Sequence, residues 1–99
     1  MEFLVEFNVE VPAGTAEAEV EERTRAEKVA AAELAADGHL LRLWRPAAGA
    51  GDPSAVGIYA ACSRAELDAL LGALPLADWL QMTVVPLAPH PNDPGRDVR

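Results

Sequence analysis

The sequence is poor in the residues from which metal and disulfide sites are built. Its 99 residues include one cysteine, Cys62, so neither a disulfide within one chain nor a thiolate metal cluster can form. The two histidines, His39 and His90, lie far apart and lack metal-binding spacing. We therefore expect no metal and no cofactor. No apolar stretch approaches the roughly 20 residues that cross a membrane, so no membrane segment is expected.

Basic residues are also scarce. Eight lysines and arginines face sixteen acidic residues, which gives a formal net charge of −8. Nucleic acids and anionic membranes require a concentrated basic surface, so neither is expected as a partner. The N-terminus, Met1-Glu2-Phe3, lacks the basic and apolar regions of a signal peptide. Because 51% of the residues are hydrophobic, we expect one folded cytoplasmic domain.

The hydrophobic pattern predicts six elements. Alternating apolar residues predict strands, a 3.6-residue period predicts helices, and turn residues separate them. Thr15 is expected to cap the first helix and Gly38 to end it, while Ser63 and Glu66 form a capping box for the second. The predicted elements are a strand at 3–11, a helix from Thr15 to about Asp37, strands at 40–45 and 55–61, a helix from Ser63 to Pro75, and a strand at 79–87.

The order β-α-β-β-α-β predicts a ferredoxin-like α+β domain over residues 1–87. Four antiparallel strands should carry two helices on one face, and the loop at 47–54 should join two strands. The other sheet face would expose Leu4 together with either Tyr59 or the pair Val56 and Ile58. Such an apolar face predicts a homo-oligomer that pairs sheet to sheet. Residues 88–99 form a Pro-rich tail that either hangs free or docks on a neighbouring subunit.

Glu27 is the first candidate for chemistry. Helical spacing places it on the stripe of Val20, Ala31 and Leu34, which should face the core. A carboxylate partly removed from water has a raised pKa and is a better base near neutrality. The alternative is a glutamate at the margin of the helix, with its carboxylate in solvent or paired with a neighbouring cation. Spacing alone leaves both interpretations open.

Arginines flank Trp44 in the second predicted strand. Arg42 and Arg45 should lie on opposite faces of the sheet, because side chains alternate along a strand. An arginine facing a pocket can hold a carboxylate ligand with two hydrogen bonds. An interface salt bridge is the alternative. His90, in the tail, is a candidate for a site on a neighbouring chain.

A set of short motifs adds a resemblance. Glu27, Gly38, Leu43-Trp44-Arg45, Leu74-Pro75-Leu76 and His90-Pro91 occur in the order and spacing of the muconolactone Δ-isomerase family, which the chain resembles over nearly its whole length. The resemblance implies a dimeric α+β barrel and a homo-oligomer, either a dimer or a larger ring such as a decamer. It also implies a cofactor-free isomerase of aromatic catabolism that shifts a double bond in a small lactone.

The resemblance also implies roles for individual residues. Glu27 would move the proton as the catalytic residue, and Lys28, Trp44, Arg45 and His90 would contribute to substrate binding. Lys28 or Arg45 would stabilise the dienolate and hold the substrate carboxylate.

The sequence departs from the family pattern at Pro46, in the Ala/Gly-rich loop that contains Asp52-Pro53, and at Ala60-Ala61. If these positions shape the pocket, the substrate differs. The alternatives are a related isomerase or cyclase acting on a different biosynthetic intermediate, a ligand-binding protein without catalysis, and a cofactor-free monooxygenase of the same fold.

Overall fold

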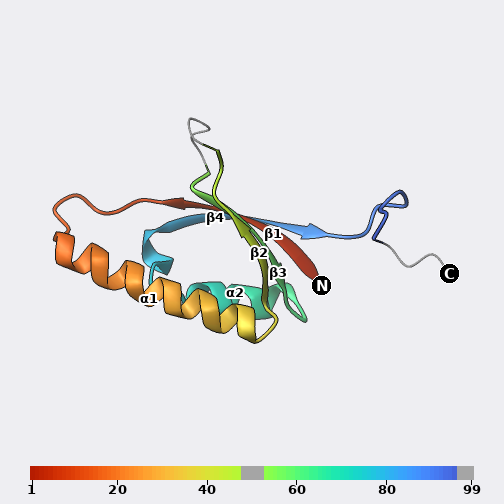
Figure 1. Ribbon diagram of the computed structural model, residues 1–99, viewed down its shortest axis with the longest axis horizontal. Coiled ribbons are helices and arrows are strands. Elements are labelled where there is room, and N and C mark those ends of the chain that lie inside the picture. The colour runs from red at the N-terminus through yellow and green to blue at the C-terminus, as the bar shows by residue number, and fades with distance from the viewer. Residues whose placement is uncertain (48–52, 96–99) are drawn as a thin grey trace.

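The computed structural model describes residues 1–47 and 53–95 and confirms the predicted element order (Figure 1). Most of the predicted loop at 47–54 and the last four residues of the tail lie outside these ranges. The elements are β1 (Glu2–Val9), α1 (Glu17–Ala36), β2 (Leu40–Trp44), β3 (Ala55–Ala60), α2 (Arg64–Gly72), a 3₁₀ turn (Ala77–Trp79) and β4 (Leu80–Leu87).

The four strands form one antiparallel sheet in the order β2-β3-β1-β4. Both helices cover the same face of this sheet (Figure 1). β4 pairs only with β1 and is therefore an edge strand, which agrees with the position of Pro86 near its end. This topology is the ferredoxin-like α+β fold that the sequence predicts.

The core lies between the sheet and α2. Phe3, Val5 and Phe7 of β1 are buried on the helix side, where they pack against Leu67 and Leu71 of α2. The predicted extension of this strand to Val11 is wrong. Strand β4 begins opposite Val9, so the chain beyond Val9 has no strand partner, and Val9 and Val11 are 42% and 43% exposed.

The helix ends agree with the sequence at two of four points. Helix α2 does not reach the predicted end at Pro75, because it stops at Gly72 with Ala73 as its C-cap. Ser63 accepts a hydrogen bond from the amide of Glu66 at 3.1 Å, and the Glu66 carboxylate accepts one from the Cys62 amide at 2.6 Å. Gly38 has the predicted left-handed backbone, with φ of +82°. The prediction for Thr15 is wrong, because Ala16 is the N-cap and the Thr15 hydroxyl donates to the carbonyl oxygen of Pro12.

The second sheet face carries no helix or strand of the described chain (Figure 1). Tyr59 is buried on the helix side, so Val56 and Ile58 are the residues of β3 that point to the open face. Ile58 lies opposite Leu4 of β1, which in turn lies opposite Val85 of β4. An apolar row therefore crosses three strands of this face.

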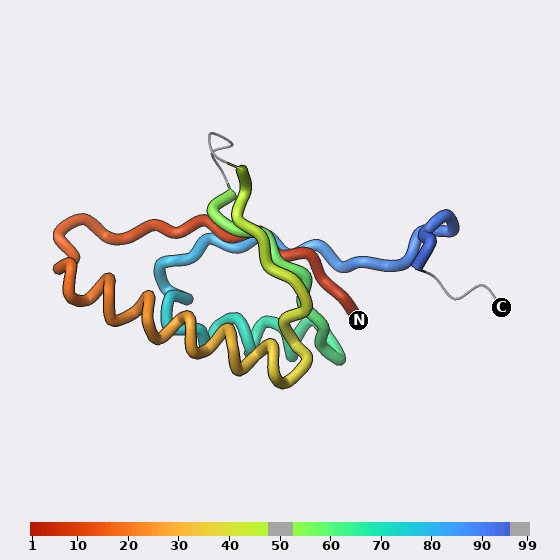
Figure 2. Tube along the Cα trace, in the orientation of Figure 1, coloured from red at the N-terminus to blue at the C-terminus, as the bar shows by residue number. Residues whose placement is uncertain are grey.

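The chain after β4 leaves the body of the molecule. In the Cα trace, the blue segment that follows Leu87 runs away from the helices and the sheet (Figure 2). Residues 88–95 are exposed. Docking of this tail on a neighbouring subunit remains a prediction.

Candidate functional site

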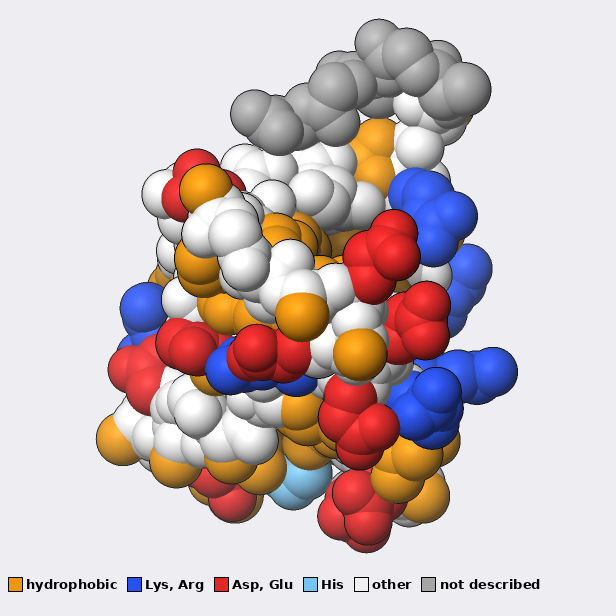
Figure 3. Space-filling model, turned by 90° about the vertical axis from the view of Figure 1, so that its left-hand side faces the viewer, with side chains coloured by type: hydrophobic (Ala, Val, Ile, Leu, Met, Phe, Trp, Pro, Cys, Tyr) orange, Lys and Arg blue, Asp and Glu red, His pale blue; other side chains and the backbone are white. Residues whose placement is uncertain are grey.

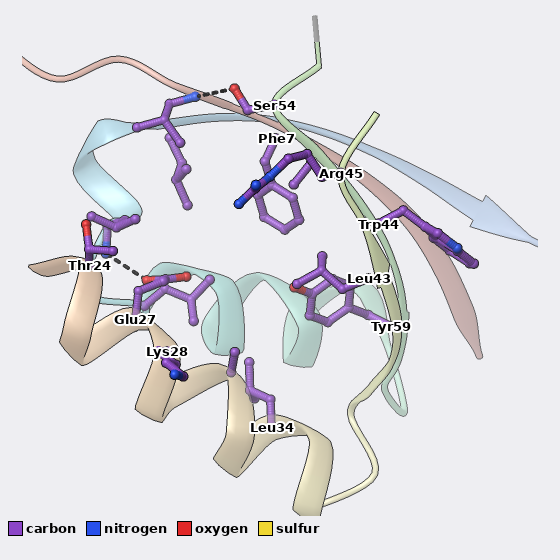
Figure 4. A pocket seen from close by; sticks show the side chains of 16 residues that line it. Phe7, Thr24, Glu27, Lys28, Leu34, Leu43, Trp44, Arg45, Ser54 and Tyr59 are labelled. Carbon is purple, nitrogen blue, oxygen red and sulfur yellow. Dashed lines mark hydrogen bonds between the residues drawn. The ribbon is translucent and has the colours of Figure 1, made fainter. Parts of the chain in front are cut away.

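A cavity of about 620 Å³ opens between α1 and the sheet (Figure 4). Its size suits a small organic ligand. Apolar side chains from all sides form most of its wall, and the ionisable side chains come from α1, from the end of β2 and from β3. The apolar part includes Phe7, Ala31, Leu34, Leu43, Leu74, Leu76 and Leu80, and the ionisable part includes Glu27, Lys28, Arg45 and Tyr59.

Glu27 is half-buried on α1 and faces this cavity (Figure 4). One carboxylate oxygen, Oε1, accepts a hydrogen bond from the backbone amide of Leu76 at 3.0 Å. Burial raises the pKa of Glu27 above its ordinary value, and the Leu76 hydrogen bond opposes part of this effect. The bond fixes the carboxylate while Oε2 has no partner among the described residues. Glu27 therefore has the position and the basicity of a general base.

The Leu76 amide is itself held in place by a residue of α1. Arg23 lies one helical turn before Glu27 and donates to the carbonyl oxygen of Pro75 at 3.3 Å and to the carboxylate of Asp78 at 2.6 Å. Its guanidinium also lies 4.3 Å from the ring centroid of Trp79. Arg23 thus ties residues 75–79 to α1 and keeps the hydrogen-bond donor next to Glu27.

The register of β2 shifts between Leu40 and Arg42, and from Arg42 onward the side chains alternate as predicted. Leu43 and Arg45 point into the cavity, whereas the indole of Trp44 points away from it (Figure 4). On the open face, the Arg42 guanidinium lies 4.6 Å from the ring centroid of Trp44. Trp44 therefore contributes backbone to the cavity wall, and its ring belongs to the exposed sheet surface.

Two cations at the cavity are available for a ligand. Neither Lys28 nor Arg45 forms an ion pair with any residue in the described ranges. By contrast, Arg25 and Arg64, on the outer surfaces of the helices, both pair with nearby carboxylates. Figure 3 shows such acidic and basic side chains interspersed over the end of the molecule where α1 begins. An anionic ligand in the cavity would meet cations that have no competing partner.

His90 lies apart from this site within one chain. It follows β4 in the tail, where its Nδ1 accepts a hydrogen bond from the amide of Asn92 at 2.9 Å. The surface beside it is formed by Met1, Glu2 and tail residues. The structure thus brings Glu27, Lys28 and Arg45 together and places His90 elsewhere. Among the described residues, no group of three or more potential ligands could hold a metal ion.

Two features of the cavity do not follow from the sequence motifs. Tyr59 and the Leu76 amide both face Glu27. The sequence did not decide on which face of the sheet the Tyr59 side chain lies, and the Leu76 amide is a backbone group that no sequence motif identifies. Conversely, Pro46, Ala60 and Ala61 do not line the cavity formed by the described residues. The expectation that these departures shape the pocket is therefore wrong for those three residues, and Asp52 lies outside the described ranges.

No helix in the part of the chain that the structure describes has the length and hydropathy needed to cross a membrane. A structure of 5-chloro-2-hydroxyhydroquinone dehydrochlorinase from Burkholderia phenoliruptrix AC1100, in complex with 2,5-dihydroxybenzoquinone, is 18% identical with a TM-score of 0.62, covering 89% of this chain and 94% of that one. At this identity the likeness concerns the fold alone.

Two other relatives are closer in sequence. The muconolactone Delta-isomerase of Cupriavidus pinatubonensis (strain JMP 134 / LMG 1197) is 32% identical over 92 residues, which cover 93% of this chain and 97% of the relative. A crystal structure of muconolactone isomerase has a TM-score of 0.85 at 28% identity and covers 100% of both chains. The family model described as Muconolactone delta-isomerase matches residues 1–93. The chain therefore belongs to the muconolactone delta-isomerase family.

Proposed function

We propose that this protein is a cofactor-free isomerase that shifts a double bond in a small unsaturated lactone similar to muconolactone. Family membership supports an isomerase-type function. The observation that carries the specific proposal is the half-buried carboxylate of Glu27, which is held by the Leu76 amide. It faces a cavity with two cations that form no ion pair within residues 1–47 and 53–95.

The reaction requires one group that both accepts and returns a proton. Glu27 takes a proton from a carbon at one end of the conjugated lactone, which leaves a dienolate whose charge extends to the carbonyl oxygen. The same carboxyl group then returns the proton at the other end of the conjugated system, and the double bond has moved. A single carboxylate suffices for both steps, and neither step consumes a metal or a nucleotide.

The cations account for binding. Arg45 points into the cavity from the end of β2 and can hold a substrate carboxylate through two hydrogen bonds. Lys28 lies at the same cavity, where its positive charge favours the dienolate over the uncharged lactone ring of the substrate. The proposal assigns substrate binding to Arg45 and Lys28 and gives the Trp44 ring no direct contact with the ligand.

The test is Glu27→Gln assayed with muconolactone and a panel of unsaturated lactones. Glutamine keeps the acceptor for the Leu76 amide but cannot carry the proton, so we expect kcat to fall about 10²–10⁴-fold. Glu33→Gln, on the exposed side of α1, is the matched control and should behave as the wild type. Wild-type turnover by Glu27→Gln would contradict the proposed base.

The same variant has a second, independent readout. Because burial raises the pKa of Glu27, the folded state holds this proton more tightly than the unfolded state. The resulting stabilisation is complete below the ordinary value of 4.5 and is lost as the pH rises through the folded pKa. Glu27→Gln should therefore melt above the wild type at pH 8, with a smaller difference near pH 4.

The alternatives are a protein that binds a ligand without catalysis and an enzyme that acts on a different intermediate. Proton exchange between a lactone and heavy water, followed by NMR, distinguishes them. A binding protein would protect the lactone without incorporating deuterium, whereas an isomerase or cyclase of another intermediate would exchange only its own substrate. Oxygen consumption would reveal a monooxygenase.

We also propose that two copies pair through the open sheet face, as in a dimeric α+β barrel. The apolar row of Leu4, Ile58 and Val85 supports this pairing, since its exposure in water is unfavourable. Light scattering should give at least a dimer mass, and Ile58→Lys should lower it. The alternative is a monomeric mass for the wild type in dilute solution.

A further inference from the structure

Tyr59 projects from the sheet into the cavity that holds Glu27. It lies on β3, opposite Phe3 of β1 and Leu40 of β2, and only 4% of its surface is exposed. In the close-up, its ring extends from the strand so that the hydroxyl faces the interior of the cavity (Figure 4). Glu27 and Tyr59 thus approach the same space from the helix and from the sheet.

The position of the Tyr59 ring is fixed by its neighbours. Phe7 packs against it edge to face, with ring centroids 6.0 Å apart and an angle of 62°. The ring also lies next to Gly57, two residues earlier on the same face of β3. A Cβ atom at Gly57 would lie 2.8 Å from Cε1 of Tyr59, which is closer than such atoms approach. The glycine therefore provides the space that the ring occupies.

The hydroxyl of Tyr59 has no hydrogen-bond partner in the part of the chain that the structure describes. None of the hydrogen bonds within the described ranges involves it, although every fully buried polar side-chain atom there has a partner. The hydroxyl is consequently not sealed in the core and remains open to the cavity. A rigidly held phenol with a free O–H in an apolar cavity is available to donate to a ligand.

The same surroundings keep this phenol protonated. Burial and, to a smaller extent, the negative charge of Glu27 raise the pKa of Tyr59 to about 12. At neutral pH the group is therefore a neutral donor, and it does not compete with Glu27 as a base.

We propose that Tyr59 is a second catalytic residue, whose hydroxyl donates a hydrogen bond to the lactone carbonyl oxygen while Glu27 moves the proton. This role rests on the proposed isomerase function. Negative charge grows on the carbonyl oxygen as the carbon–hydrogen bond breaks, so the hydrogen bond is stronger in the transition state than in the bound substrate. The proton travels from carbon to Glu27 and back to carbon, and Tyr59 keeps its own.

The proposal divides the polar groups of the cavity between the two ends of the ligand. Arg45, at the end of β2, would hold the substrate carboxylate, and Tyr59, near the C-terminal end of β3, would meet the carbonyl oxygen. Glu27 lies across the cavity on α1, where it can reach carbon atoms between these two ends. A lactone lacking the carboxylate should therefore lose affinity while its remaining turnover still depends on Tyr59.

The test is Tyr59→Phe, which removes one oxygen atom and preserves the packing with Phe7 and Gly57. We expect kcat to fall about 10²-fold, as for loss of one donor to an oxyanion, with KM and melting temperature nearly unchanged. Thr24→Val is the matched control, because it removes another hydroxyl from the cavity wall. Its kcat should stay within about threefold of the wild type.

The outcomes separate this role from the proposed function. If Glu27→Gln is inactive and Tyr59→Phe retains wild-type kcat, the role of Tyr59 is overturned and the isomerase proposal stands. A fall in kcat that Thr24→Val shares equally also overturns it, because the effect would then come from cavity polarity in general. If the wild type neither converts any lactone nor exchanges its protons with heavy water, the proposed function fails, and the role of Tyr59 fails with it.

Discussion

Helix α1 has 20 residues and buries none of them completely, whereas α2 has nine residues and buries Leu67 and Leu71. Both helices cover the same face of the sheet, yet only α2 completes the hydrophobic core. Along α1, Glu27, Ala31 and Leu34 line the cavity, and the half-buried Leu34 also packs against the core. The fold is thus stabilised mainly through α2, and α1 stands far enough from the sheet to leave room for a ligand.

The largest effect should come from the core helix. Leu67 is fully buried, so Leu67→Ala should lower the free energy of unfolding by about 2–5 kcal/mol, measured by urea denaturation. Leu34→Ala makes the same change on α1, where the side chain is only half-buried, and should lower it by about 1 kcal/mol or less. Equal losses in the two variants would show that α1 contributes to the core as much as α2 does.

A side chain added on α1 should reduce binding rather than stability. Ala31 lines the cavity, so Ala31→Leu should place new atoms in the ligand space and raise KM by about tenfold or more. The free energy of unfolding should change little, because the cavity is not close-packed. Ala32 is exposed on the same helix, and Ala32→Leu is the matched control. A loss of stability without a change in KM would place Ala31 in a packed core.

The smallest effect concerns the polar contacts that hold α1. Arg23→Met removes the bonds to Pro75 and Asp78 and should lower the free energy of unfolding by about 1 kcal/mol. It should also loosen the Leu76 amide and reduce kcat. Arg64→Met on α2 breaks only an exposed pair with Asp68 and should have an effect below about 0.5 kcal/mol. If Arg23→Met and Arg64→Met changed stability and kcat to the same extent, the polar contacts of α1 would be no more important to the site than those of α2.

The sequence predicted the fold well because its strongest signals are local. Alternation in β1, the capping box of α2 and the glycine after α1 each specify an element from a few adjacent residues. The error at Val11 arose because the length of a strand depends on where its partner begins, and the partner of β1 lies at the other end of the chain.

The site was less predictable, because it depends on contacts between distant segments. Helical periodicity placed Glu27 on the inner face of α1, and strand alternation separated Arg45 from Arg42. Neither pattern could show that the indole of Trp44 points outward or that the Leu76 amide bonds Glu27. The orientation of Tyr59 remained undecided, since β3 has apolar residues on both faces and only tertiary packing selects between them.

The hydrogen bond between Glu27 and Leu76 joins residues that are 49 positions apart, one from each half of the βαββαβ chain. Neither half contains a complete site, because Glu27 precedes the connection between β2 and β3 while Tyr59 and Leu76 follow it. During refolding, each half can form only its own helix before docking, because every strand pairing, β2 with β3, β1 with β3 and β1 with β4, joins one half to the other. Catalytic activity should therefore return only with the final docking of the two halves, which would make enzyme turnover a kinetic probe of the last step of folding.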